Sequence, residues 1–216
     1  MLKAESAVLL LAGTILLVLH VDGVNSASGI VHPCNSTASS ATGVVVACPQ
    51  SDGNALGAAG LTISVTVRDN TNAPIVGMPR ADVWLAGCNF LLVLCGGSGA
   101  INAAAPTNVL GQTTITGDIA AGGCDVGVKV IVQGIVIGGG ACAPICLGIA
   151  VRSPDLVGAA GGLPDYKVNS LDLAKFATDY RSPPKAYNPC IDYIAPFGIV
   201  DLGDFAVFGR HFNHKC

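Results

Sequence analysis

The sequence has 216 residues, of which 12% are charged, with 11 Lys and Arg residues against 14 Asp and Glu residues. A chain with so little positive charge and no basic patch cannot follow a phosphate backbone, so we expect no nucleic-acid partner. Aromatic residues make up 5% of the chain, which argues against an open sugar-binding platform of stacked rings.

The first segment has the layout of a secretory signal peptide. Lys3 carries a positive charge, and residues 7–19 form an uncharged run shorter than the roughly 20 residues that a membrane-spanning helix needs. Small and polar residues follow, and we expect cleavage near Ser26–Ser28. We therefore assign residues 1–27 to a signal peptide and predict a secreted protein, extracellular or at the cell surface, with no membrane segment after cleavage. The alternative is an uncleaved N-terminal anchor.

The chain contains nine cysteines, and in an exported protein these indicate disulfides first. Because nine is an odd number, at least one thiol is free, shared between chains or modified.

Residues 28–152 are predicted to form a β domain, because short runs alternate between apolar and polar side chains. Turn residues such as those at 68–74 separate the runs. The expected strands and extended pieces lie at Gly43–Cys48, Leu61–Val67, Ile75–Pro79, Ala81–Leu85, Gln112–Thr116, Val126–Gln133 and Ile145–Val151. About seven short strands without helical periodicity predict a mainly β fold of the β-sandwich type.

Two stretches of this region resemble the bacterial Ig-like domains of the invasin and intimin kind. Val65–Gly77 is similar to their V-x-V-x-D-x-x-G-x-P-V-x-G motif, and Thr107–Thr114 to their T-N-x-x-G-x-A/T-T motif. Ala73 stands where the family has a glycine after the turn asparagine. The resemblance implies an Ig-like β-sandwich that serves as a spacer or adhesion module. A different kind of β-sandwich is the alternative.

Residues 153–216 contain an internal repeat with a spacing of 32 residues. The two copies are Lys167–Phe176 and Ile199–Phe208. In the second half of each copy and beyond it, apolar residues recur at i, i+3, i+4 and i+7. This spacing is one face of a helix, so each copy is predicted to be a loop followed by a helix. We expect the two helices to pack face to face and hide their aromatic side chains. Cys190 and Cys216 flank the second copy, and we expect a disulfide between them that stabilises this small module.

The two copies resemble the repeats of dockerin modules, which read D-x-N-x-D-G-x-V-N-x-x-D-L-A and continue into a helix. Dockerin loops bind Ca²⁺ in the manner of an EF-hand, so the resemblance implies weak calcium sites made of oxygen ligands. The implied ligands are Asp165, Asn169, Asp172, Asp192, Asp201 and Asp204, with Asp155 as a displaced first ligand and the carbonyl groups of Lys167 and Ile199 as further ligands. Both copies lack part of the first half of the motif.

A metal-free alternative needs only helix capping. Asn169 and Asp201 are placed to accept backbone N–H bonds, and the acidic residues three positions later lie where a helix start favours negative charge. Dockerins bind cohesin modules through positions 10 and 11 of a repeat. The resemblance places that contact at Ser170, Leu171, Leu202 and Gly203.

No catalytic motif accompanies these features, and we expect no enzyme activity. His211, His214 and Cys216 have the spacing of a small zinc site, although solvated histidines and a disulfide-bonded cysteine are the favoured interpretation. The sequence therefore predicts an attachment protein whose C-terminal module docks onto a cohesin-like protein or assembles with itself. The alternatives are a structural subunit of an extracellular filament or surface layer, and an accessory component of a polysaccharide-degrading complex.

Overall fold

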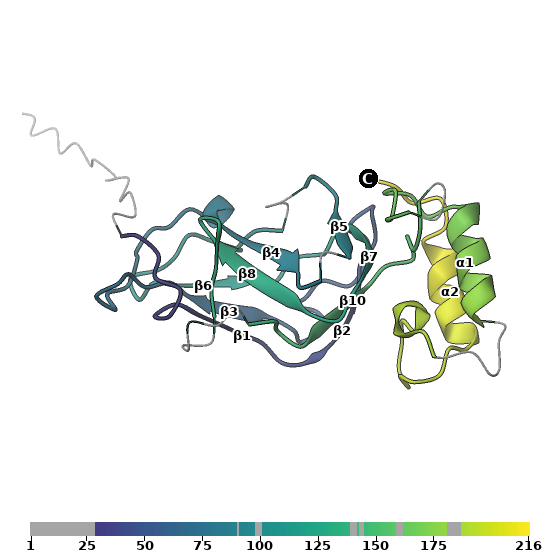
Figure 1. The fold of residues 1–216 in the computed structure, drawn as a ribbon, viewed down its shortest axis with the longest axis horizontal. Helices are drawn as coiled ribbons and strands as arrows, with labels where there is room; N and C mark the ends of the chain where they lie inside the picture. The colour runs from purple at the N-terminus through teal and green to yellow at the C-terminus, as the bar shows by residue number, and fades with distance from the viewer. Residues whose placement is uncertain are drawn as a thin grey trace, which may run out of the picture.

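The regular structure consists of short strands followed by two α-helices (Figure 1). The computed structural model describes residues 29–89, 91–97, 101–138, 142, 145–158, 162–180 and 187–216. The predicted signal peptide lies outside these residues. The strands are β1 (Thr37–Ser39), β2 (Gly43–Val46), β3 (Ile63–Thr66), β4 (Val83–Gly87), β5 (Leu92–Leu94), β6 (Gln112–Ile115), β7 (Ala121–Asp125), β8 (Val128–Val132), β9 (Ile135–Val136) and β10 (Ile149–Arg152). The helices are α1 (Ser170–Tyr180) and α2 (Leu202–Arg210), with 3₁₀ turns η1 (Arg80–Asp82) and η3 (Pro189–Ile191).

The strands form three hydrogen-bonded sheets around one apolar core. β3 lies between β1 and β6, and β8 lies between β4 and β9, with antiparallel neighbours in each case. The remaining sheet has the order β2-β10-β7-β5, in which β2 runs parallel to β10. This parallel pair brings the start of the β part beside its last strand.

Alternation of side chains decides which face of each strand is buried. Ile63 and Val65 of β3 lie in the core, while Ser64 between them is exposed. β4 and β8 follow the same rule, with every second residue buried. The predicted fold class is confirmed: the chain is mainly β, consistent with an Ig-like sandwich, and has a small C-terminal part with two helices.

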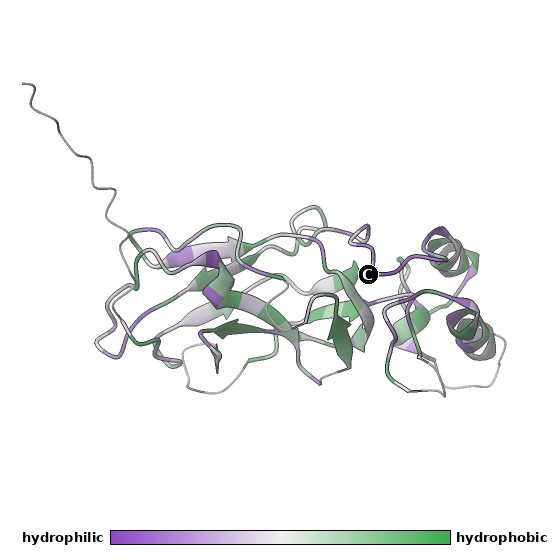
Figure 2. Ribbon diagram, turned by 90° about the horizontal axis from the view of Figure 1, so that it is seen from above, coloured by the Kyte–Doolittle hydropathy of each residue, from purple (hydrophilic) through white to green (hydrophobic). Residues whose placement is uncertain are grey.

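The two helices lie side by side at one end of the elongated molecule, beyond β7 and β10 (Figures 1 and 2). Phe176 of α1 and Phe208 of α2 are buried, with ring centroids 5.2 Å apart. Tyr180 and Phe205 remain partly exposed, so the expected burial of the aromatic side chains is incomplete. None of the helices in the described ranges is long and apolar enough to cross a bilayer.

Four disulfides connect the chain, and their pairing differs from the expected one. The pairs are Cys34–Cys142, Cys88–Cys146, Cys95–Cys216 and Cys124–Cys190. The predicted bond between Cys190 and Cys216 is wrong, because each of these residues lies against a cysteine of the β part rather than against the other. The C-terminal part is therefore bonded twice to the sandwich. Cys48 is the one free cysteine in the described chain, and it is buried.

Candidate functional site

In each repeat, a buried carboxylate of the helix start holds the backbone of the preceding loop. Asp172 Oδ1 accepts hydrogen bonds from the N–H groups of Leu156 and Val157, at 2.7 and 2.9 Å. Its Oδ2 accepts a bond from the N–H of Asn169 at 2.8 Å. Because Asp172 lies in the first turn of α1, it connects the segment that enters the loop to the helix that leaves it.

Asp155 holds the other half of the first loop. Its carboxylate accepts hydrogen bonds from the N–H groups of Asp165, at 3.3 Å, and Tyr166, at 2.9 Å. Tyr166 makes the tight turn at this point with a φ of 67°. Asp155 thus acts as the first residue of the loop, although an insertion separates it from the rest of the repeat in the sequence.

The first loop gathers negative charge in a buried place. Burial, followed by the negative charge of Asp172, raises the pKa of Asp155 to about 7. Burial also raises the pKa of Asp172. Among the described residues, the Oδ1 atom of Asp165 is buried and has no hydrogen-bond partner. Burial and the neighbouring negative charges therefore make it costly to ionise Asp155 and Asp172 together.

The second loop repeats this arrangement with other residues. Asp204, in the first turn of α2, accepts hydrogen bonds from the N–H groups of Tyr193 and Ile194 through one oxygen. Its other oxygen accepts a bond from the N–H of Asp201 at 2.8 Å. Asp204 is therefore the counterpart of Asp172, as the sequence repeat predicts.

Asp192 is the counterpart of Asp155. It accepts a hydrogen bond from the N–H of Gly198 at 2.7 Å, as Asp155 does from Tyr166. Gly198 has a φ of 103°, a left-handed conformation that glycine adopts easily and tyrosine does not. The two loops therefore share a turn with positive φ at matching positions as well as their acidic residues, although the first loop is longer.

The remaining predicted ligands serve the backbone. Asn169 Oδ1 accepts the N–H of Leu171 at 2.8 Å, and Asp201 Oδ1 accepts the N–H of Gly203 at 2.7 Å. Asp201 and Asp204 together form a capping box at the start of α2. The backbone of Lys167 forms a β-bridge with Lys215, and the side chain of Ile199 is exposed.

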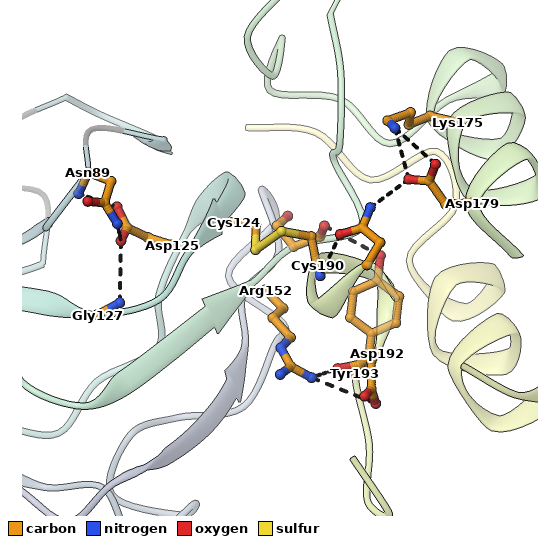
Figure 3. Close-up of a disulfide and its surroundings, with 12 residues drawn as sticks. Asn89, Cys124, Asp125, Gly127, Arg152, Lys175, Asp179, Cys190, Asp192 and Tyr193 are labelled. Carbon is orange, nitrogen blue, oxygen red and sulfur yellow. Dashed lines mark hydrogen bonds and ion pairs between the residues drawn. A yellow bond between two sulfur atoms is a disulfide. The ribbon is translucent and has the colours of Figure 1, made fainter. Parts of the chain in front are cut away.

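A buried guanidinium distinguishes the second loop from the first. Arg152, at the end of β10, has its Nη1 atom 3.7 Å from Asp192 Oδ1 and donates a hydrogen bond to the Asp192 carbonyl group (Figure 3). The ring of Phe197 lies 5.0 Å from the same guanidinium. Arg152 therefore supplies positive charge inside the loop. The repeat pattern does not reveal it, because it lies in the β part, 40 residues before Asp192.

These contacts limit where a calcium ion fits. Among the described residues, no three of these carboxylates bring one oxygen each within 4.8 Å of one another. The second loop does not fit the ion, because Arg152 already supplies its cation and Phe197 stands at a ligand position of the motif. The first loop keeps Asp165 Oδ1 as an unused acceptor. Calcium binding therefore stays a prediction, confined to the first loop.

The predicted partner-binding residues lie at the two helix starts. Ser170 and Leu171 are exposed, and Leu202 is 73% exposed. Gly203 is half-buried, and a Cβ atom at this position would meet the side chain of Ile194. Three of the four residues are thus accessible to another protein.

Exposed apolar side chains gather in the second repeat. The set, here called the second-repeat surface, consists of Ile194, Phe197, Ile199, Leu202 and Phe205. It continues into an apolar groove lined by Leu173, Phe205, Phe208, Gly209 and Phe212. The helical periodicity of the sequence instead predicts that many of these apolar side chains lie at the interface between the two helices. Ile199 and Leu202 lie outside the helical stripe, and that position is the signal that marks them as surface residues.

A cleft also lies between the β part and the helices, beside the disulfide Cys124–Cys190 (Figure 3). Asp179 in its lining accepts hydrogen bonds from Lys175, at 2.8 Å, and from Asn188, at 2.6 Å. These groups satisfy one another. The described lining residues include no histidine or serine that would act as a base or a nucleophile.

Comparison with known proteins gives little to add to this geometry. No family model matches the sequence, and no curated protein matches it. The invasin-type and dockerin resemblances therefore have no support from these comparisons. A solved structure described as "Crystal structure of the Lin-41 filamin domain" is 15% identical and covers 55% of this chain and 95% of its own, with a TM-score of 0.31. A TM-score this low does not establish a common fold.

Proposed function

We propose that the chain is a secreted, non-catalytic attachment protein whose second-repeat surface binds another extracellular protein. The exposure of this surface carries the proposal. Ile199 and Leu202 are 63% and 73% exposed, whereas Phe176 and Phe208 fill the interface of the helices. Five large apolar side chains exposed within residues 194–205 are typical of an interaction site rather than of a closed surface.

The charge of this segment indicates the chemistry of the partner. Asp201 is its one exposed charged residue, since Asp204 is buried. The partner, a cohesin-like protein if the dockerin resemblance holds, is therefore expected to present an apolar patch rather than a strongly charged one. Because Arg152 closes the second loop without a metal ion, docking through this repeat is proposed not to require calcium there.

The disulfides support both the location and the role. Four disulfides favour an oxidising environment outside the cytosol. Cys95–Cys216 and Cys124–Cys190 fix the helices to the sandwich, so the sandwich carries the attachment surface as a spacer or adhesion module. The buried carboxylates stabilise loop backbone, which supports a role without catalysis.

The test compares three forms of the protein from residue 28 onward as bait for the surface-protein fraction of the source cells. The wild-type chain and a Val109→Asp/Leu110→Asp control, altered at exposed residues of the β part, are expected to enrich the same protein. A Leu202→Asp/Phe205→Ser chain is expected to lose it, and the recombinant partner should show the same order of affinities. Sedimentation of each form alone separates this result from self-assembly. The proposal is contradicted if the wild-type chain is monomeric and enriches no protein beyond those that the Leu202→Asp/Phe205→Ser chain also enriches.

A further inference from the structure

Four side chains from opposite ends of the chain meet where the β part touches the end of α2. Cys48 follows β2, and Asp52 lies in the loop after it. His211 is the residue after α2, and His214 lies one turn further. One ligand atom from each of these four residues lies within 4.8 Å of all the others, and they form the one such set in the described part of the chain.

Four of the six separations between these ligand atoms are close to the edge lengths of a tetrahedron around zinc. His214 Nδ1 lies 3.4 Å from Cys48 Sγ, 3.4 Å from His211 Nδ1 and 3.2 Å from Asp52 Oδ1. His211 Nδ1 lies 3.4 Å from Asp52 Oδ1. Tetrahedral zinc with Zn–N bonds of about 2.0–2.1 Å requires nitrogen–nitrogen separations of about 3.3–3.4 Å.

Hydrogen bonds can satisfy only some of these close contacts at the same time. A ring nitrogen has either one N–H or one lone pair, so His214 Nδ1 can serve one partner well. Here it faces a sulfur, a nitrogen and a carboxylate at once. Four donor atoms that surround one point are the expected arrangement of a metal site in which each lone pair is used.

The backbone on both sides of the cluster is held in place. The N–H of Cys48 donates to the Ile119 carbonyl group, and its own carbonyl group accepts the N–H of Ser51. The carbonyl group of His214 accepts the N–H of Val168, which attaches the C-terminal segment to the first repeat. These backbone hydrogen bonds hold the segments that carry the ligands in place, which reduces the cost of binding a metal ion.

We propose that Cys48, Asp52, His211 and His214 form a structural zinc site that joins the β part to the end of α2. Four protein ligands of N, O and S type suit tetrahedral Zn²⁺ and fill its coordination shell, so the site is structural rather than catalytic. The thiolate and the carboxylate balance the charge of the ion. The site also accounts for Cys48, the cysteine that remains after four disulfides have formed.

The test measures metal in the disulfide-bonded protein from residue 28 onward, after dialysis against zinc and removal of loose metal. We expect one zinc per chain by mass spectrometry. The cobalt-exchanged protein is expected to show a tetrahedral visible band and a sulfur-to-cobalt charge-transfer band. Cys48 is expected to react with a thiol reagent only after chelation. A folded wild-type protein without zinc, with copper in its place, or without the sulfur-to-cobalt band overturns the proposal.

Substitutions locate the ion. His214→Ala and Asp52→Asn are each expected to lower zinc affinity more than about 10-fold, since loss of even an outer-shell partner costs 10–100-fold. Asp52 lies at the surface, so Asp52→Asn is expected to fold even where Cys48→Ser does not. Asp118→Asn, at an exposed carboxylate beside Cys216, is the matched control and is expected to bind zinc normally. Equal zinc affinity in all of these proteins contradicts this site.

Discussion

Arg152 Nη1 lies 3.7 Å from Asp192 Oδ1, and both side chains are almost completely removed from solvent. Asp155, the counterpart of Asp192 in the first loop, instead faces the negative charges of Asp172 and Asp165. Two loops with matching acidic residues therefore place the first of these residues in opposite electrostatic surroundings. The second is neutralised by a side chain of the sandwich, while the first concentrates carboxylates.

Replacement of Arg152 is expected to destabilise the protein strongly. Arg152→Met leaves the buried Asp192 carboxylate without its cation, and breaking a buried pair in this way costs about 3–5 kcal/mol. Denaturant unfolding measures the loss. Arg80→Met, at an exposed arginine, is expected to unfold like the wild type. Adding Asp192→Asn to Arg152→Met should recover part of the stability. Equal stability of Arg152→Met and Arg80→Met would show that the pair of Arg152 and Asp192 contributes nothing to stability.

The first loop is expected to make the protein less stable as the pH rises. The pKa of Asp155 is raised to about 7 in the folded state, so its stabilising effect is complete below the unfolded value near 4 and is lost as the pH rises through 7. Between pH 5 and 8, in chelator, the free energy of unfolding should fall by about 2–3 kcal/mol from this group. Asp155→Asn should show a flatter profile. A wild-type profile that rises over this range contradicts the assignment.

Much of the fold could be predicted because it depends on local periodicity. The alternation in Leu61–Val67 predicts β3, and the repeated apolar spacing predicts α1 and α2. β7 could not be predicted, because Ala121–Asp125 contains two glycines and no β-branched residue. Tertiary packing explains this composition. A Cβ atom on Gly122 would overlap Asp155 Oδ2, so the strand can have no side chain at the point where the first loop crosses it.

The candidate sites were predictable only where the repeat encodes them. The equivalence of Asp172 and Asp204 follows from the spacing of 32 residues and is present in their hydrogen bonds. Contacts between distant segments leave no such pattern. Cys48 and His214 are 166 residues apart, and nothing local in either segment indicates the other. The disulfide partner of Cys190 could not be predicted either, because the spacing of cysteines in a sequence does not determine how they pair.

Calcium titration is expected to show no more than one ion per chain. Each loop keeps a buried carboxylate oxygen without a hydrogen-bond partner, but Asp192 Oδ1 of the second loop lies 3.7 Å from Arg152 Nη1, whereas no cation is paired with Asp165 Oδ1 of the first loop among the described residues. Calorimetry with calcium at millimolar concentrations, the range of extracellular modules, measures the stoichiometry. Binding should disappear in Asp165→Asn and persist in Asp201→Asn, which alters the helix cap of the second repeat. Two ions per chain would show that Arg152 does not exclude the metal.

Removal of Cys190 is expected to release a distant thiol. In Cys190→Ser, the free thiol should appear on Cys124, whereas Cys216 should stay bonded to Cys95. Non-reducing peptide mapping distinguishes this outcome from a Cys190–Cys216 bond, which would release Cys216 instead. The Cys124–Cys190 disulfide spans 66 residues. Its loss in the double substitution Cys124→Ser/Cys190→Ser should lower the free energy of unfolding by about 4 kcal/mol in the chain-entropy description. Most of that loss should appear as earlier unfolding of α1 and α2, because this bond fixes η3, and with it the connection between the helices, to β7.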